Sequence, residues 1–242
     1  MSSNSLRLSA LSFVASLCGL VLAAGLASAE CPNVSGNASP VVDRSDLRQT
    51  LRQCANESRR LTEHRQMLAC NALVRYACTP SSGRILSTED REILVWAYSI
   101  RASALLDLGH TDQALADLND ALLLDANNEQ VLTNRCRIRA ASNRELDLAL
   151  ADCDAAIRVD ANSANALDSR GLTHLRRNEL EAALADFDAA IQREPSSASA
   201  LYGRAIVNAR LGRAEQVQTD IAAAANIDEH VDDWFTAIGL TP

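Results

Sequence analysis

A short motif recurs in this chain at a nearly constant interval, and this recurrence restricts the possible folds more than any other property. The motif Ala-Leu-Ala-Asp begins at Ala114, Ala149 and Ala183, so its copies are 35 and 34 residues apart. A weaker copy begins another 34 residues on, at Val217. An alanine follows at the matching place in each copy: Ala121, Ala156, Ala190 and Ala224. A fixed period of this length is typical of an array of stacked supersecondary units.

Each motif is preceded by a second pattern, an arginine followed by a small residue. The pairs are Arg101-Ala102, Arg135-Cys136, Arg170-Gly171 and Arg204-Ala205. Seven residues beyond each small residue stands a residue that tolerates the left-handed conformation ending a helix: Gly109, Asn143, Asn178 or Gly212. Each copy therefore predicts a helix, a tight turn and a second helix. A composition with only 3% aromatic residues also favours an all-α chain over a sheet.

These patterns resemble the tetratricopeptide repeat (TPR), in four copies spanning roughly residues 95–228. The third copy is the best match, with Gly171, Ala183, Phe187, Ala190 and Pro195 in family positions. The resemblance implies a right-handed α-solenoid of antiparallel helix pairs. Because one helix pair cannot bury its apolar face alone, neighbouring pairs are expected to stack.

The rest of the chain divides around this array. Segment 1–29 reads as a signal peptide, because an apolar run after Arg7 ends in the small residues Ala27-Ser28-Ala29. Cleavage there would place the protein in the periplasm of a bacterium or outside the cell; an uncleaved membrane anchor is the alternative. The expected order of the parts is signal peptide 1–29, flexible lead 30–42, helical hairpin or degenerate repeat 43–78, TPR array 87–228 and C-terminal capping helix 229–242.

Charge excludes some classes of partner. Without Arg7 the chain carries 22 basic and 31 acidic residues, a net charge near −9, and it contains no lysine. An acidic protein repels nucleic acids and anionic lipids. We therefore expect no nucleic-acid partner and no membrane insertion after signal cleavage, while the oligomeric state stays open.

Six cysteines remain once Cys18 leaves with the signal segment, and an even number in an exported chain favours disulfides. Cys136 and Cys153 point into the seam of one helix pair, either as a disulfide or as two inert buried thiols. Cys54 with Cys70 is a similar pairing across the N-terminal hairpin. Cys31 and Cys78 would pair with each other or stay free.

The TPR resemblance implies a binding surface on the concave face, lined by the first helix of each pair. The residues expected there are Trp96, Ser99, Ser103, Gln130, Thr133, Arg137, Asn165, Asp168, Leu172, Ser199, Tyr202 and Ile206. Trp, Arg and Tyr are the residue types most enriched at binding hot spots. The alternative is that these positions are ordinary solvated helix faces. The recurring Arg and Asp of each copy are instead expected to pair across packed helices as structural links.

Nothing in the sequence marks a catalytic centre. The four histidines are dispersed without metal-ligand spacing, and no phosphate-binding glycine loop is present. The predicted function is a non-catalytic scaffold that binds a protein or peptide, without cofactor or metal. Two alternatives stay open: a structural subunit of an envelope assembly using the convex face or the hairpin, and a thiol-dependent enzyme with Cys31 or Cys78 as nucleophile.

Overall fold

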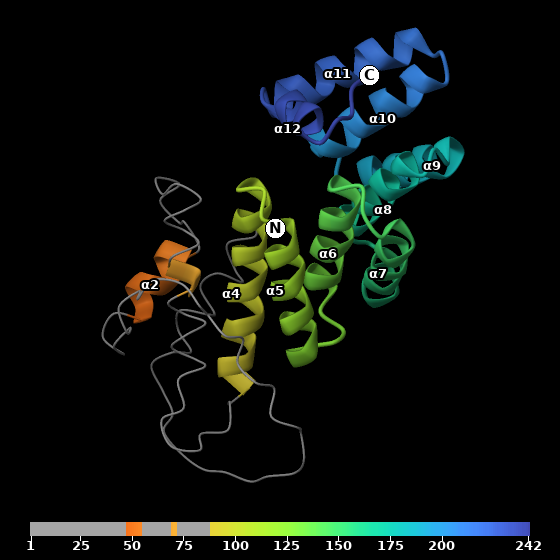
Figure 1. The fold of residues 1–242 in the computed structure, drawn as a ribbon. Coiled ribbons are helices and arrows are strands. Elements are labelled where there is room, and N and C mark those ends of the chain that lie inside the picture. The colour runs from red at the N-terminus through yellow and green to blue at the C-terminus, as the bar shows by residue number, and fades with distance from the viewer. Residues whose placement is uncertain (1–46, 55–68, 72–87) are drawn as a thin grey trace, which may run out of the picture. The chain divides into compact units, whose positions relative to one another are not determined.

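The computed structural model describes part of the chain, namely residues 47–54, 69–71 and 88–242. Every element of regular structure among these residues is an α-helix (Figure 1). The predicted signal peptide 1–29 and the lead 30–42 lie outside them, as do Cys31 and Cys78. The chain forms two compact units, Met1–Arg101 and Ala102–Pro242.

The first unit contains α2 (Leu47–Cys54) and the beginning of α4 (Thr88–Asp107). A disulfide joins Cys54 at the end of α2 to Cys70, with the two sulfur atoms 2.07 Å apart. Beside it, the Asn71 side-chain oxygen accepts a 2.6 Å hydrogen bond from Arg101 Nη1. Segment 69–71 is thereby linked both to α2 and to α4.

The second unit consists of the end of α4 and eight further helices. These are α5 (Thr111–Leu124), α6 (Glu129–Ala141), α7 (Leu146–Val159), α8 (Ala164–Arg176), α9 (Leu180–Arg193), α10 (Ala198–Arg210), α11 (Ala214–Ile227) and α12 (Val231–Ala237). Consecutive helices pair as α6 with α7, α8 with α9, and α10 with α11 (Figure 1). The first helices α6, α8 and α10 pack against one another in sequence, and α12 packs on α10 and α11. The pairs therefore stack as the repeat predicts.

The turns follow from local chemistry. All four residues predicted to end a first helix have positive φ, namely Gly109, Asn143, Asn178 and Gly212. The helices α6, α8 and α10 begin alike, because the side chains of Asn128, Ser163 and Ser197 each accept a hydrogen bond from the backbone N–H three residues on. A side chain caps the start of each of these three helices, and a left-handed residue follows its end. All three helices therefore have the same length of 13 residues.

Small residues let the helices approach closely. The four recurrent alanines of the second helices, Ala121, Ala156, Ala190 and Ala224, are all fully buried. The Phe187 ring of α9 fills the space between two glycines, Gly171 of α8 and Gly203 of α10. A Cβ atom on Gly203 would lie only 2.5 Å from Phe187 Cζ, so this contact requires glycine. Phe187 thus joins its own helix pair to the next one.

Candidate functional site

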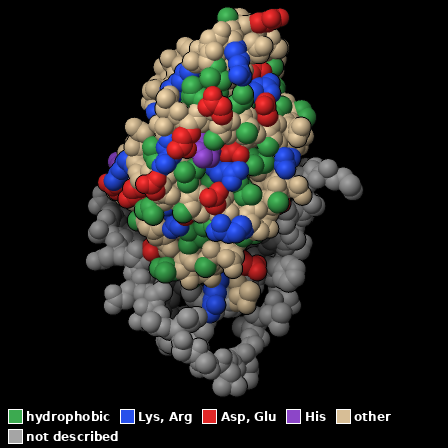
Figure 2. Space-filling view, turned by 90° about the vertical axis from the view of Figure 1, so that its right-hand side faces the viewer, with side chains coloured by type: hydrophobic (Ala, Val, Ile, Leu, Met, Phe, Trp, Pro, Cys, Tyr) green, Lys and Arg blue, Asp and Glu red, His purple; other side chains and the backbone are tan. Residues whose placement is uncertain are grey.

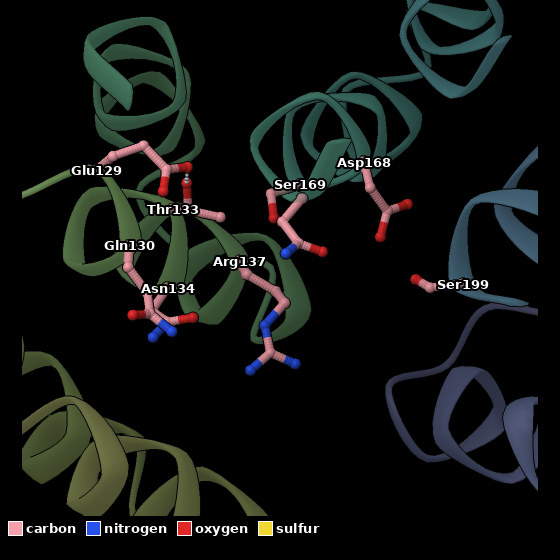
Figure 3. A pocket seen from close by; sticks show the side chains of 9 residues that line it. Glu129, Gln130, Thr133, Asn134, Arg137, Asp168, Ser169 and Ser199 are labelled. Carbon is pink, nitrogen blue, oxygen red and sulfur yellow. Dashed lines mark hydrogen bonds between the residues drawn. The ribbon is translucent and has the colours of Figure 1, made fainter. Parts of the chain in front are cut away.

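A groove of about 380 Å³ lies along the first helices α6, α8 and α10 and is open to solvent (Figure 3). Its lining residues all have polar or charged side chains. They are Glu129, Gln130, Thr133, Asn134, Arg137, Asn165, Asp168, Ser169 and Ser199. A surface of this kind favours a ligand that forms hydrogen bonds and ion pairs over an apolar one.

Helical periodicity explains why α6 contributes most of this surface. Gln130, Thr133, Asn134 and Arg137 are separated by three or four residues, which places them on one face of α6. The opposite face, with Cys136 and its neighbours, is buried against α7. The same alternation on α8 and α10 brings Asp168 and Ser199 toward the groove.

Glu129 is part of the wall of the groove. Its Oε1 atom accepts hydrogen bonds from Thr133 Oγ1 at 2.9 Å and from Ser163 Oγ at 2.6 Å. The Ser163 hydroxyl also caps α8, so one bond connects the start of α6 to the start of α8. These bonds hold the two helices in register and satisfy the Glu129 carboxylate within the protein.

Arg137 differs from the arginines beside it on α6. Arg135 and Arg139 both bind Asp152 of α7, and Arg135 does so through two hydrogen bonds of 2.5 and 2.9 Å. Within the described part of the chain, no ion pair or hydrogen bond is found for the Arg137 guanidinium. Figure 3 shows this guanidinium extending into the groove. A guanidinium carries five N–H donors, which suit a carboxylate.

Asp168 is the second charged group available in the groove. Its Oδ1 atom is buried and has no hydrogen-bond partner among the residues described here. Burial raises the pKa of the Asp168 carboxyl to about 6, although the Ser199 hydroxyl and the Arg137 guanidinium act to lower it. No ion pair joins Asp168 to Arg137 in the described residues, so the groove presents two separate, opposite charges.

The structure brings together half of the predicted binding residues. Six line the groove: Gln130, Thr133, Arg137, Asn165, Asp168 and Ser199. Trp96 and Ser99 belong to the first unit, and the partly buried Ser103 of α4 is not among the lining residues. Three lining residues were not predicted from the sequence, namely Glu129, Asn134 and Ser169. The one-turn spacing of Asn134 from Gln130 is a signal that would have identified it.

Three predicted binding residues are instead part of the hydrophobic core. Leu172, Tyr202 and Ile206 are buried, and the Tyr202 ring packs on Phe235 of α12 with ring centroids 4.9 Å apart. The interpretation of Tyr202 as an accessible hot spot is therefore wrong. The reason is that the last helix covers the surface of α10 that a further repeat would otherwise cover.

The recurring Arg and Asp form structural links, as predicted, in the three complete copies of the second unit. Arg170 Nε and Nη2 each lie 2.8 Å from one oxygen of Asp186, and Arg204 binds Asp220 in the same way. Each arginine also reaches the second helix of the preceding pair, as Arg170 does through Asp154 at 2.8 Å. These links connect three helices at once and lie outside the groove.

The structure contains both disulfides that the sequence favours among the described cysteines. Besides the Cys54–Cys70 bond, Cys136 of α6 is joined to Cys153 of α7, with sulfur atoms 2.04 Å apart. Among the described residues there is no group of three or more His, Cys, Asp or Glu side chains placed to hold a metal ion. No helix in this part of the chain is long and apolar enough to span a membrane.

Comparisons with known proteins agree on the fold. No protein-family model matches the chain, and no curated protein is similar to it in sequence. The solved structure of MamA residues 41 to the end from Desulfovibrio magneticus RS-1 is 17% identical, with a TM-score of 0.53 over 74% of this chain and 96% of that one. A double mutant of MamA RS-1 is also 17% identical, with a TM-score of 0.52 over 76% of this chain and 97% of that one.

A weaker likeness, with a TM-score of 0.45 and 19% identity, is to the first TPR domain of RPAP3 solved with an HSP90 peptide; it covers 49% of this chain and 93% of that one. The helix pairs, their turns and the likeness to MamA together define an all-α solenoid of the TPR type. At 17% identity the likeness to MamA establishes the fold, and function has to be argued from the groove.

Proposed function

We propose that this chain is a non-catalytic scaffold, exported from the cell that makes it, which binds a protein or peptide partner in the groove of α6, α8 and α10. The observation that carries the proposal is the presence of two opposite charges in a polar groove: Asp168, whose buried Oδ1 atom has no hydrogen-bond partner in the described residues, and Arg137, which forms no ion pair or hydrogen bond there. Charged groups placed in this way in a groove are suited to a ligand that carries the opposite charges.

An extended peptide suits this surface better than a folded apolar ligand. The amide side chains of Gln130, Asn134 and Asn165 each offer both donors and acceptors along the groove. A peptide backbone brings N–H and C=O groups that need such partners. The helices presenting them are fixed by the Glu129 bonds and the disulfide, so little conformational entropy is lost on binding.

Export is supported by cysteine chemistry. Disulfides persist in oxidising compartments, and two are present in the described residues. Together with the apolar segment 1–29, they favour the bacterial periplasm or the exterior as the location. Edman sequencing of the protein from the envelope fraction tests this, because cleavage would leave Glu30 as the first residue.

A second candidate is the structural subunit of an envelope assembly that uses the second helices. Exposed Leu123, Leu148, Val159 and Ile227 on α5, α7 and α11 favour it. On the face shown in Figure 2, however, hydrophobic side chains are scattered among charged ones. The groove is therefore the better supported site.

Site-specific photo-crosslinking in the native cell tests the groove directly. A photo-reactive amino acid at exposed Asn165 should capture a partner, whereas the same residue at exposed Gln192 of α9 should not. Arg137→Gln should reduce capture, and Arg158→Gln, an exposed arginine of α7, serves as the matched control. Capture from Gln192 but not from Asn165 would transfer the site to the second helices. Amine-reactive reagents are unsuitable because the chain has no lysine.

A further inference from the structure

Only three side chains that line the groove carry a formal charge, and they are in different situations. Glu129 Oε1 accepts hydrogen bonds from two hydroxyl groups of the wall. Asp168 Oδ1 is buried without a donor, and Arg137 has neither an ion pair nor a hydrogen bond in the described residues. No ion pair joins the last two in the described residues, although Arg137 lowers the pKa of Asp168, so each can still bind an opposite charge on a ligand.

The contrast with the rest of the array shows that this is not a general property of the fold. Asp152, Asp186 and Asp220 are buried, and each accepts two hydrogen bonds from an arginine of the adjacent first helix. The array thus satisfies buried carboxylates wherever they are structural. A buried polar atom without a partner destabilises the folded state, and more so when it is charged. Asp168 carries this cost at its buried Oδ1 atom, and Asp168 lies in the groove.

A cation relieves this situation better than a neutral donor. The Ser199 hydroxyl already lies beside Asp168 and does not cancel the effect of burial. An ammonium or guanidinium group both donates a hydrogen bond and neutralises the charge, and charge-assisted bonds are about twice as strong as neutral ones. The net charge of −8 would also steer basic segments toward the protein.

The positions of the two charges set the spacing on the ligand. Arg137 comes from α6, while Asp168 comes from the neighbouring helix α8 and faces Ser199 of α10 (Figure 3). Axes of packed helices are about 8–10 Å apart, and an extended chain advances about 3.3 Å per residue. Two ligand side chains that reach these groups are therefore about two to four residues apart.

We propose that the groove recognises a peptide segment with an acidic and a basic side chain about two to four residues apart, the ligand carboxylate binding Arg137 and the ligand cation binding the carboxylate of Asp168. This inference rests on the proposed function, because it names the chemistry of the ligand in the same groove. It assigns Asp168 and Arg137 to opposite ends of one ligand.

Synthetic peptides provide the test. The probes are fluorescent decapeptides with blocked ends, carrying one Asp and one Lys from one to seven positions apart in a Gly/Ser background, in both orders. Each has an analogue with Lys replaced by Gln and one with Asp replaced by Asn. Binding is measured by fluorescence anisotropy at pH 7.5 to the mature wild type and to Asp168→Asn, Arg137→Gln and the exposed control Glu181→Gln.

We expect the tightest binding at separations of two to four residues and in one of the two orders. Asp168→Asn should weaken binding of the peptide that carries both Asp and Lys about tenfold or more, and it should leave binding of the Lys-to-Gln analogue unchanged. Arg137→Gln should likewise weaken binding of the peptide that carries both charges and leave binding of the Asp-to-Asn analogue unchanged. Glu181→Gln should change neither. A variant effect that is confined to the matching peptide charge is not produced by a general loss of fold.

Three other results overturn the inference. If Asp168→Asn weakens binding of the peptide with both charges and of its Lys-to-Gln analogue equally, Asp168 does not bind the cation. Free lysine or aspartate competing as well as the peptides would mean that the ligand is a small molecule. Binding by no peptide also overturns it, and crosslinking at Asn165 then decides whether the proposed function fails too.

Discussion

Asp168→Asn should make the unliganded protein more stable at neutral pH, although it removes a side chain from the proposed binding site. The carboxyl has a pKa of about 6 in the folded chain, against an ordinary value of 3.8. Between these values the folded state holds the proton more tightly than the unfolded state does. Stability conferred by the protonated group is thus complete below about pH 4 and is lost as the pH rises through 6.

The size of the effect follows from the pKa difference. A shift of one pKa unit corresponds to 1.36 kcal/mol, so the raised pKa from 3.8 to about 6 sets an upper limit of roughly 3 kcal/mol. Asparagine has nearly the same shape and carries no charge to desolvate. We expect Asp168→Asn to raise the free energy of unfolding by about 1–3 kcal/mol at pH 8 and to have little effect at pH 4.

Urea unfolding of the mature chain, followed by circular dichroism at 222 nm from pH 4 to pH 8, measures this difference. Glu181→Gln, an exposed carboxylate of α9, is the control and should follow the wild type at every pH. A stability difference that is the same at all pH values would refute the reasoning, as would a less stable Asp168→Asn at pH 8. A gain in the free energy of unfolding on removal of the Asp168 carboxylate indicates that this side chain is retained for binding at the expense of stability.

Substitutions at three places in the fold test the packing. Replacing both Cys136 and Cys153 by alanine should lower the free energy of unfolding by about 3 kcal/mol, because their loop spans 17 residues, and urea titration measures it. Gly203→Ala should lower it by about 1–3 kcal/mol through the clash with Phe187, and adding Phe187→Leu should recover part of this loss in a double-mutant cycle. Tyr202→Ala should lower it by about 3 kcal/mol by removing a buried ring, so its melting temperature should fall well below that of Arg137→Gln.

Those parts of the fold that depend on local chemistry could be predicted from the sequence. The positive φ of Gly109 and Asn143 follows from residue type and position in the repeat. The burial of Ala121 and its counterparts follows from helical periodicity. Both features depend on neighbours within about one repeat, and the periodic pattern contains them.

The binding surface was predicted only in part, because it depends on contacts between distant segments. Tyr202 occupies the position of a groove residue, but Phe235, 33 residues further on, covers it. No pattern around Tyr202 indicates how α12 packs. The state of Asp168 is equally non-local, since burial raises its pKa while Arg137 of α6 and Ser199 of α10 act to lower it. The TPR resemblance therefore placed Asp168 on the binding surface but did not predict its chemistry.

Comparison of the second and third copies shows two ways of filling one seam. Cys136 matches Gly171, and Cys153 matches Phe187, so a disulfide stands in α6–α7 where a ring over a glycine stands in α8–α9. The two ends of the groove thus depend on different interactions, since Arg137 directly follows Cys136 whereas Asp168 lies on the helix packed by Phe187. If the disulfide holds α6 in place, replacing both cysteines by alanine should reduce the protein's preference for the peptide with both charges over its Asp-to-Asn analogue. The protein should keep its preference for the same peptide over the Lys-to-Gln analogue. An equal loss of both preferences would show that α6 and α8 move as one body.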